Sequence, residues 1–226
     1  MSDQYYTNKL YPLQNKVLKV LNQASTKLYL TGGTVVSRIY YHHRYSDDLD
    51  LFLNWDKDFV KESGKAIAAI KEKFRLVRDD ISQDSFARVF VHEKSSVLKV
   101  EFVNDVEFHS GGFQSSSLYH KIDTPKNILS NKVCALSRSA AKDLADLIWI
   151  SRNEKFNWNK IFEDAKKKDS WVNEVDVLLA IKKFPIEKLL SDVKWIRKTS
   201  AKRLQSDIKV ILKDMASAAN NSLCKK

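Results

Sequence analysis

Residues 30–34 read Leu-Thr-Gly-Gly-Thr, and residues 44–52 read Arg-Tyr-Ser-Asp-Asp-Leu-Asp-Leu-Phe. The first stretch ends a short apolar run that predicts a strand, and its two glycines precede a predicted helix over 34–41. The second stretch alternates apolar and acidic residues, which predicts a strand over 49–53. Glycines let a backbone approach a ligand closely, and a helix N-terminus offers unpaired N–H groups. The order of strand, Gly-Gly, helix and strand therefore predicts a phosphate cradle.

Asp48 and Asp50 lie two residues apart at the start of the second predicted strand. Alternation in a strand places both side chains on one face, where two carboxylates repel each other unless a cation lies between them. Mg²⁺ prefers oxygen ligands and usually binds one or two carboxylates plus substrate phosphates. The pair therefore predicts a Mg²⁺ site, with Mn²⁺ as the alternative ion.

Two-metal phosphoryl transfer calls for a third acid, and Glu101 in the predicted strand 97–103 is the candidate. We expect antiparallel pairing to bring Glu101 beside the two aspartates, as a metal ligand or as the general base for an attacking hydroxyl. The alternative is a glutamate on the exposed face of a strand.

The whole chain predicts an α+β fold in two domains. Residues 1–124 would form a catalytic domain with a mixed sheet, and residues 125–226 a helical, basic C-terminal domain. The expected helices of the first domain cover 8–23, 34–41 and 57–73, and its expected strands cover 27–31, 49–53, 75–78, 86–92 and 97–103. The helices expected in the second cover 126–152, 157–168, 173–183, 185–197 and 200–218.

The net charge of +11 is concentrated in the second predicted domain. Residues 1–125 contain 17 Lys and Arg against 16 Asp and Glu, and residues 126–226 contain 22 against 12. This asymmetry predicts a polyanionic partner, with nucleic acid first, while a lysine-rich surface that keeps the protein soluble is the alternative. The candidate phosphate contacts are Lys160, Lys166, Lys167, Lys194, Arg197, Lys198, Lys202 and Arg203. Trp158, Trp171 and Trp195 would stack on bases or pack between helices.

Several classes of protein are not indicated. The two cysteines have no metal-type spacing and suggest no disulfide framework. The N-terminus lacks a signal pattern, and no apolar run approaches the ~20 residues needed to span a bilayer. We therefore expect a cytoplasmic protein without membrane partners.

On a single helix over 126–152, the residues Lys132, Ser139, Asp143 and Asp146 would share one polar stripe. Lys132 would then neutralise a triphosphate, and Asp143 or Asp146 would orient it or the base. A solvated helix face is the alternative.

The sequence resembles the AbiEii/AbiGii toxin family of nucleotidyltransferases, within the polymerase-β-like superfamily. The resemblance lies in 31–34 and 43–52, and in a second block that reads Lys-Val-Cys-Ala-Leu-Ser-Arg at 132–138 and Lys-Asp-Leu-Ala-Asp-Leu at 142–147. It departs at Glu101, where aspartate is commoner, and at Lys142, where arginine is frequent.

The resemblance implies a polymerase-β-like catalytic domain, a helical C-terminal domain, NTP as substrate and Mg²⁺ as cofactor. It implies a toxin of a toxin–antitoxin or phage-defence pair, with an antitoxin as partner and RNA, above all the tRNA 3′ end, as acceptor. The catalytic candidates are Asp48, Asp50, Glu101, Lys132 and Asp146. The nucleotide-binding candidates are Gly32, Gly33, Thr34, Arg44, Ser46, Lys132 and Asp143.

The function expected is transfer of NMP from an NTP to RNA. Two alternatives stay open: the same transfer to a protein or small-molecule hydroxyl, and a non-catalytic nucleic-acid-binding protein with the same fold.

Overall fold

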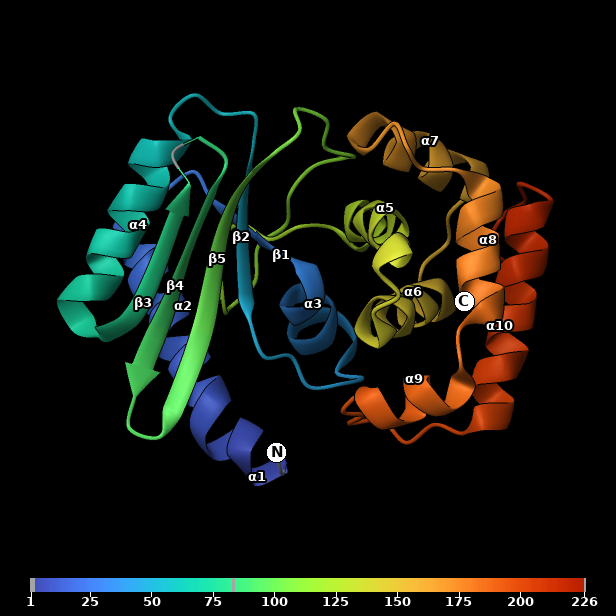
Figure 1. Cartoon of the computed structure of the whole chain (residues 1–226), viewed down its shortest axis with the longest axis horizontal. Helices are drawn as coiled ribbons and strands as arrows, with labels where there is room; N and C mark the ends of the chain where they lie inside the picture. Colours follow the sequence, from blue (N-terminus) through green and yellow to red (C-terminus); the bar gives the residue numbers. More distant parts are fainter. Residues whose placement is uncertain (1–2, 83, 226) are drawn as a thin grey trace. The chain divides into compact units, whose positions relative to one another are not determined.

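The computed structural model describes residues 3–82 and 84–225, and it divides into two compact units (Figure 1). The first consists of Met1–Val35 and Ser46–Asp123, and the second of Val36–Tyr45 and Thr124–Lys226. The second unit thus includes a segment from the N-terminal half, which the sequence analysis placed in the catalytic domain. That the chain has two independent domains stays a prediction.

A five-stranded mixed sheet forms the first unit. Its strands are β1 (Tyr29–Thr31), β2 (Leu49–Asn54), β3 (Arg75–Ser82), β4 (Phe86–Glu93) and β5 (Ser96–Asp105), in the order β1-β2-β5-β4-β3. The β2–β5 pair is parallel, and the other neighbours are antiparallel. The expected antiparallel pairing of β5 with β2 is therefore wrong. The tight hairpin that joins β4 to β5 makes β5 run in the same direction as β2.

Alternation separates the two faces of this sheet. In β2 the residues Leu49, Leu51 and Leu53 are buried, while Asp50 and the residues in phase with it are half-buried. The helices α2 (Tyr11–Ala24) and α4 (Phe59–Lys73) pack together on one side of the sheet (Figure 1). Their apolar stripes meet the leucine face, so the half-buried face is the one that carries the acids.

The turn between β1 and β2 begins with α3 (Gly32–Thr34), which continues as a π-helix over Val35–Tyr41. Before α2 the chain forms α1 (Asp3–Tyr5) and a π-helical segment over Tyr6–Leu10. The predicted helix over 34–41 therefore starts at the glycines themselves.

The rest of the second unit is helical: α5 (Pro125–Ala135), α6 (Ala141–Asn153), α7 (Trp158–Lys168), α8 (Glu174–Lys183), α9 (Ile186–Asp192) and α10 (Ala201–Ala216). The single long helix predicted over 126–152 is wrong. After a short 3₁₀ turn, Ser139 takes a left-handed conformation (φ 53°) and Ala140 is extended, so the chain turns before α6. The turn lets α5 pack against α6, and α6 becomes almost wholly buried.

The helix predicted over 185–197 is too long, because α9 ends at Asp192. The backbone that follows pairs with the segment 36–45 of the same unit instead of with itself. Tyr45 N donates to Lys194 O at 2.8 Å, and Ile196 N and Arg197 N donate to His43 O at 2.9 and 3.1 Å. In the parts of the chain that the structure describes, no helix is long and apolar enough to cross a membrane.

The turn after β1 yields a stability prediction. Gly32 has φ +71°, and a Cβ built on it would lie 2.4 Å from Asp50 Oδ2. We expect Gly32→Ala to lower the free energy of unfolding by more than about 1 kcal/mol, because both the backbone and the carboxylate must shift. Urea unfolding measures this. Gly64→Ala, in α4 with nothing within 4 Å of its added Cβ, is the control and should be neutral or stabilising.

Candidate functional site

The sheet register places Asp50 and Glu101 side by side. Asp50 is the partner of Thr31 on β1 and of Glu101 on β5, and Glu101 is the partner of Arg88 on β4. Directly paired residues point to the same face, so these four side chains form a row across the half-buried face. Asp48, two residues before Asp50, lies on the same face. The pattern of alternating acids in the sequence therefore becomes a cluster on one surface of the sheet.

Glu101 is held by two cations. Lys99 Nζ lies 2.9 Å from Glu101 Oε2 and 3.2 Å from Asp48 Oδ2, so it bridges the two carboxylates. Arg88 Nε donates to Glu101 Oε1 at 2.8 Å. Burial raises the pKa of Glu101, but hydrogen bonds from Lys99 and Arg88 outweigh it and leave the pKa below its ordinary value. Glu101 is thus ionised and a weak base.

A Mg²⁺ ion calls for oxygen ligands such as carboxylates. Within residues 3–82 and 84–225, no group of three or more His, Cys, Asp or Glu side chains is placed to hold a metal. Two carboxylates on one face, Asp48 and Asp50, suit Mg²⁺ that arrives with substrate phosphates. Glu101 would first have to release Lys99 or Arg88, so its role as third ligand stays a prediction. The residues present fit one ion carried by a nucleotide.

Gly32 brings its backbone against the acid pair. Since even a methyl group at this position would touch Asp50 Oδ2, glycine is needed there for the carboxylate to keep its place. Gly33 lies next to it in α3, and the amides of this first turn are among those that a helix leaves without an internal partner. This geometry is compatible with the predicted phosphate cradle.

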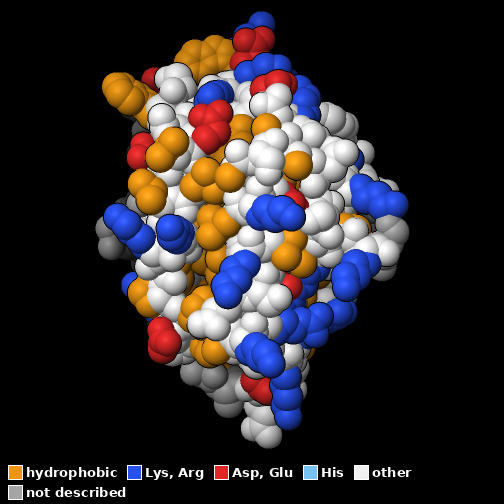
Figure 2. Space-filling model, turned by 90° about the vertical axis from the view of Figure 1, so that its right-hand side faces the viewer, with side chains coloured by type: hydrophobic (Ala, Val, Ile, Leu, Met, Phe, Trp, Pro, Cys, Tyr) orange, Lys and Arg blue, Asp and Glu red, His pale blue; other side chains and the backbone are white. Residues whose placement is uncertain are grey.

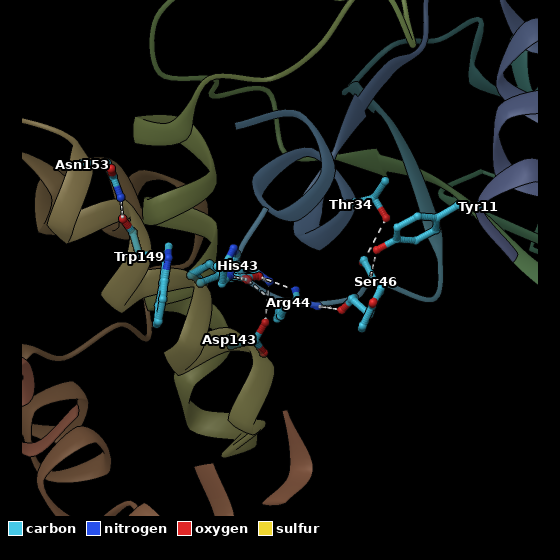
Figure 3. A network of polar contacts seen from close by, with 11 residues as sticks. Tyr11, Thr34, His43, Arg44, Ser46, Asp143, Trp149 and Asn153 are labelled. Atoms are coloured by element: carbon cyan, nitrogen blue, oxygen red, sulfur yellow. Dashed lines mark hydrogen bonds and ion pairs between the residues drawn. The ribbon is translucent and has the colours of Figure 1, made fainter. Parts of the chain in front are cut away.

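Thr34 and Ser46 hold the loop that leads into Asp48 (Figure 3). Thr34 Oγ1 lies 3.0 Å from Ser46 Oγ and 2.5 Å from Asp48 O. Ser46 N donates to Tyr11 Oη at 3.2 Å, and Gln14 Nε2 donates to Ser46 O at 3.1 Å. Both hydroxyl residues are buried. They therefore fix the position of Asp48, the first of the two aspartates. A direct role of Thr34 and Ser46 in nucleotide binding stays a prediction.

The remaining predicted site residues cluster in the second unit around the Asp146 carboxylate, and Figure 3 labels two of them, Arg44 and Asp143. Arg44 Nε and Nη2 donate to Asp146 Oδ1 and Oδ2, each at 2.7 Å. Lys132 Nζ lies 2.9 Å from Asp146 Oδ2 and 2.6 Å from Asp143 Oδ1. The Asp146 side chain has no exposed surface. Lys132, Asp143 and Asp146, which were predicted to share one helix, thus come from α5 and α6, and Arg44 joins them from the segment 36–45.

Charge pairing determines the protonation of this cluster. Burial raises the pKa of Asp146, but Arg44 and Lys132 lower it well below its ordinary value. Burial lowers the pKa of Lys132, but Asp146 and Asp143 outweigh it and raise the pKa. Both groups are therefore charged near neutral pH, as a buried ion pair needs to be.

His43 completes the cluster and was not among the predicted site residues. Its Nε2 lies 3.0 Å from Asp146 Oδ1, and its ring stacks on Trp149 with centroids 5.1 Å apart. Because a carboxylate can only accept, Nε2 carries the proton in the neutral ring. Burial lowers the pKa of His43 below its ordinary value of 6.5. Its position next to Arg44, at the start of the resemblance block 43–52, was the available signal.

Lys99 and Arg88 are the other site residues that the sequence analysis missed. Lys99 precedes Glu101 by two positions in a strand, a spacing that predicts the same face, whereas Arg88 is brought in only by the β4–β5 pairing.

The candidate RNA-binding residues differ in their surroundings. Lys160 is paired with Asp164, and Lys166 with Glu174. Trp158 is fully buried, and the Trp195 ring packs on Trp149 with centroids 5.0 Å apart, so both pack between helices. Four of the cationic candidates are exposed and lie before or within the first turn of α10: Arg197, Lys198, Lys202 and Arg203. Trp171, which lies between α7 and α8, is exposed as well.

Comparison with known proteins places these features in a family. The profile described as "Nucleotidyl transferase AbiEii toxin, Type IV TA system" matches residues 17–221. A crystal structure of a proposed nucleotidyltransferase from H. pylori is similar at 20% identity, with a TM-score of 0.60 and 96% of each chain covered. That of JHP933 from Helicobacter pylori is similar at 20% identity and TM-score 0.60, covering 96% of this chain and 94% of that one. No curated protein matches the chain significantly by sequence. The predicted α+β nucleotidyltransferase fold is confirmed.

The buried cluster yields a prediction on stability. Asp146→Asn keeps the shape of the side chain but leaves Arg44 and Lys132 with less opposing charge in a buried site. We expect the free energy of unfolding to fall by about 3–5 kcal/mol, as when one partner of a buried ion pair is removed. Denaturant titration measures this. Asp192→Asn, at an exposed position, should change it by less than about 0.5 kcal/mol, and equal effects of the two changes would contradict the prediction.

His43 yields a prediction on pH. Its lowered pKa means that the unfolded chain takes up a proton near pH 6.5, while the folded chain does so only at lower pH. Stability should therefore fall as the pH drops below about 6.5, by at most about 1.4 kcal/mol per pH unit from this residue. His43→Gln should flatten that slope in urea unfolding at several pH values, and the exposed His42→Gln should leave it unchanged. An unaltered slope in His43→Gln would refute this role.

Proposed function

The chain belongs to the AbiEii family of nucleotidyl transferase toxins of type IV toxin–antitoxin systems, and from this premise we propose that it transfers NMP from an NTP to the 3′ end of an RNA. The family membership and the enzyme class, a nucleotidyltransferase, agree with the expectations from the sequence. The first candidate acceptor is tRNA. The observation that carries the proposal is the pair of aspartates on the half-buried face of the sheet, beside the backbone of Gly32.

In the proposed reaction a terminal ribose hydroxyl attacks the α-phosphorus of the NTP. A new P–O bond forms, the bond to the β-phosphate bridging oxygen breaks, pyrophosphate leaves with the bond electrons, and the hydroxyl proton passes to a base. Mg²⁺, when bound, supplies positive charge that offsets the charge of the triphosphate. Catalysis of this kind depends mainly on positioning and electrostatics.

Asp48 and Asp50 would hold the Mg²⁺, and the backbone of Gly32 and Gly33 would hold phosphate oxygens. Thr34 and Ser46 support this arrangement by fixing the loop before Asp48. Lys99, poised between Asp48 and Glu101, would offset negative charge on the same face. Glu101 stays a candidate for the third ligand or the base, with its pairing to Arg88 and Lys99 as the obstacle.

In the second unit, Lys132 stays the predicted triphosphate contact, with Asp143 and Asp146 orienting it. Its ammonium group is paired with both carboxylates, so contact with a triphosphate would require it to leave one of them. Arg44 is bound in a bidentate pair to Asp146. We therefore propose that Arg44 helps to position Asp48 through the backbone that joins the two residues, and that it does not contact a phosphate.

The proposal of an RNA acceptor rests on charge. The excess of cations lies at residues 126–226, and the exposed group formed by Arg197, Lys198, Lys202 and Arg203 would contact phosphates. A cationic small molecule would be repelled by such a surface. Inhibition of growth by modified RNA, relieved by an antitoxin encoded elsewhere, would follow from this activity.

The test is incubation with total tRNA, Mg²⁺ and each α-labelled NTP in turn. We expect label in tRNA with one NTP, and a loss of at least about 100-fold in the double variant Asp48→Asn/Asp50→Asn, since both charges of the metal site are removed. Asp47→Asn is the matched control, because Asp47 accepts a hydrogen bond from Tyr6 and lies outside the acid face.

Two results would contradict the proposal. Absence of label with every NTP would exclude tRNA as the acceptor and direct the assay to other RNAs and to protein hydroxyls. Equal activity of the double variant and the wild type would show that the aspartates do not hold the metal.

A further inference from the structure

Lys99 lies among the acidic side chains on the half-buried face of the sheet. Asp50 on β2 is paired with Glu101 on the parallel strand β5. In the same register, the residues two positions earlier, Asp48 and Lys99, lie beside each other. The Lys99 ammonium lies 3.2 Å from Asp48 Oδ2 and 2.9 Å from Glu101 Oε2. A positive group therefore joins the first aspartate to the residue that was expected as the third acid.

Lys99 differs from the lysines that cover the surface. Figure 2, which views the side of the molecule that carries α8 and α10, shows many Lys and Arg side chains spread over the exterior. Cations of that kind are surrounded by water and screened by salt, so their ion pairs contribute little to stability. The Lys99 side chain is 29% exposed and the Glu101 side chain only 16%. The ammonium is therefore part of a partly buried site, where its charge acts on its neighbours more strongly.

A second metal ion would need the oxygens that this ammonium contacts. In two-metal phosphoryl transfer the ions lie ~3.5–4 Å apart. With one ion at Asp48 and Asp50, the second would lie between Asp48 and Glu101 and take Asp48 Oδ2 and Glu101 Oε2 as ligands. Lys99 Nζ is in contact with these same two atoms. Because two like charges at one site repel each other, the ammonium and the second ion exclude each other.

Glu101 is also held at its other oxygen. Arg88 Nε and Nη2 both donate to Glu101 Oε1, at 2.8 and 2.5 Å, while Lys99 Nζ donates to Glu101 Oε2. Hydrogen bonds between charged groups are stronger than neutral ones. To bind a metal, Glu101 would have to give up one of these partners, which would leave a partly buried cation with less opposing charge. The pairing thus favours Glu101 as the residue that holds Lys99 over Glu101 as a metal ligand.

The charges on this face match a site for one divalent ion. Three ionised carboxylates that carry two divalent ions have a net charge of one positive unit. The same three carboxylates with Lys99, Arg88 and a single divalent ion have that net charge as well. The two side chains together therefore supply the charge of one ion, and a triphosphate would meet the same balance of charge in both cases.

We propose that this site takes one divalent ion, at Asp48 and Asp50, and that the ammonium of Lys99 occupies the place of the second ion. The inference rests on the proposed function and narrows it, since Glu101 then holds Lys99 and is not a metal ligand. In the transfer of NMP, Lys99 is a catalytic residue whose charge stabilises the negative charge that develops on the transferred phosphoryl group.

Equilibrium dialysis of the full-length chain against Mn²⁺ and inorganic triphosphate counts the bound ions. Inorganic triphosphate replaces the NTP, because phosphate oxygens suffice to carry an ion to the carboxylates. The quantity counted is the Mn²⁺ that a protein binds at saturation in excess of the double variant Asp48→Asn/Asp50→Asn. The wild type should bind one such ion per chain. Lys99→Met keeps the length of the side chain without its charge and should bind two, because Asp48 and Glu101 can then share an ion.

Two further variants serve as matched controls. Lys99→Arg keeps the positive charge, and Lys61→Met removes a charge at an exposed position of α4, so both should bind one ion. Two ions in the wild type or in Lys99→Arg, or one ion in Lys99→Met that circular dichroism shows to be folded, would overturn the inference and leave the proposed function standing. A wild type that binds no more Mn²⁺ than the double variant would overturn both.

Discussion

The carboxylate of Asp146, which has no exposed surface, joins the segment 36–45 to α5 and α6 in the second unit. Arg44, Lys132 and His43 all bind to it, and none of these side chains is more than 10% exposed. A charge that is removed from water must find opposite charge and hydrogen bonds nearby. The residues that supply them come from α5 and from a segment almost 90 positions earlier in the chain. Their convergence explains why Val36–Tyr45 belongs to the helical unit.

The ion pair of Arg44 with Asp146 also restrains the chain that leads to Asp48, on the half-buried face of the sheet. Arg44 is four residues before Asp48, and the intervening loop is fixed by Thr34, Tyr11 and Gln14. Tyr45 also bonds to the backbone of Lys194. The loop that introduces the first aspartate thus has both ends held, one by the buried ion pair and the other by the sheet. As the proposed metal ligand, Asp48 would need such support, because small displacements of a metal ligand change the rate strongly.

On the half-buried face of the sheet, ion pairing weakens a role that the sequence predicted. Glu101 lies where a third carboxylate was expected, directly beside Asp50. Its oxygens are engaged by Arg88 and Lys99, which lower its pKa and reduce its basicity. Lys99 also supplies positive charge beside Asp48. Under the proposed function, a nucleotide would meet two carboxylates and an ammonium group on this face.

The sequence by itself determined the elements whose signals are local. Alternation predicted β2 and the shared face of Asp48 and Asp50, the glycines marked the turn at Gly32, and helical periodicity predicted α2, α4, α7 and α10. Tertiary structure decided what depends on distant partners: the parallel pairing of β5, the break after Ala135 and the early end of α9. Lys132 could not be paired with Asp146 from spacing, because the break at Ser139 moves the two residues to different helices. Arg44 could not be paired with it either, because the two residues are 102 positions apart in the chain. A buried charge selects its partners by desolvation in three dimensions, and that selection has no period along the chain.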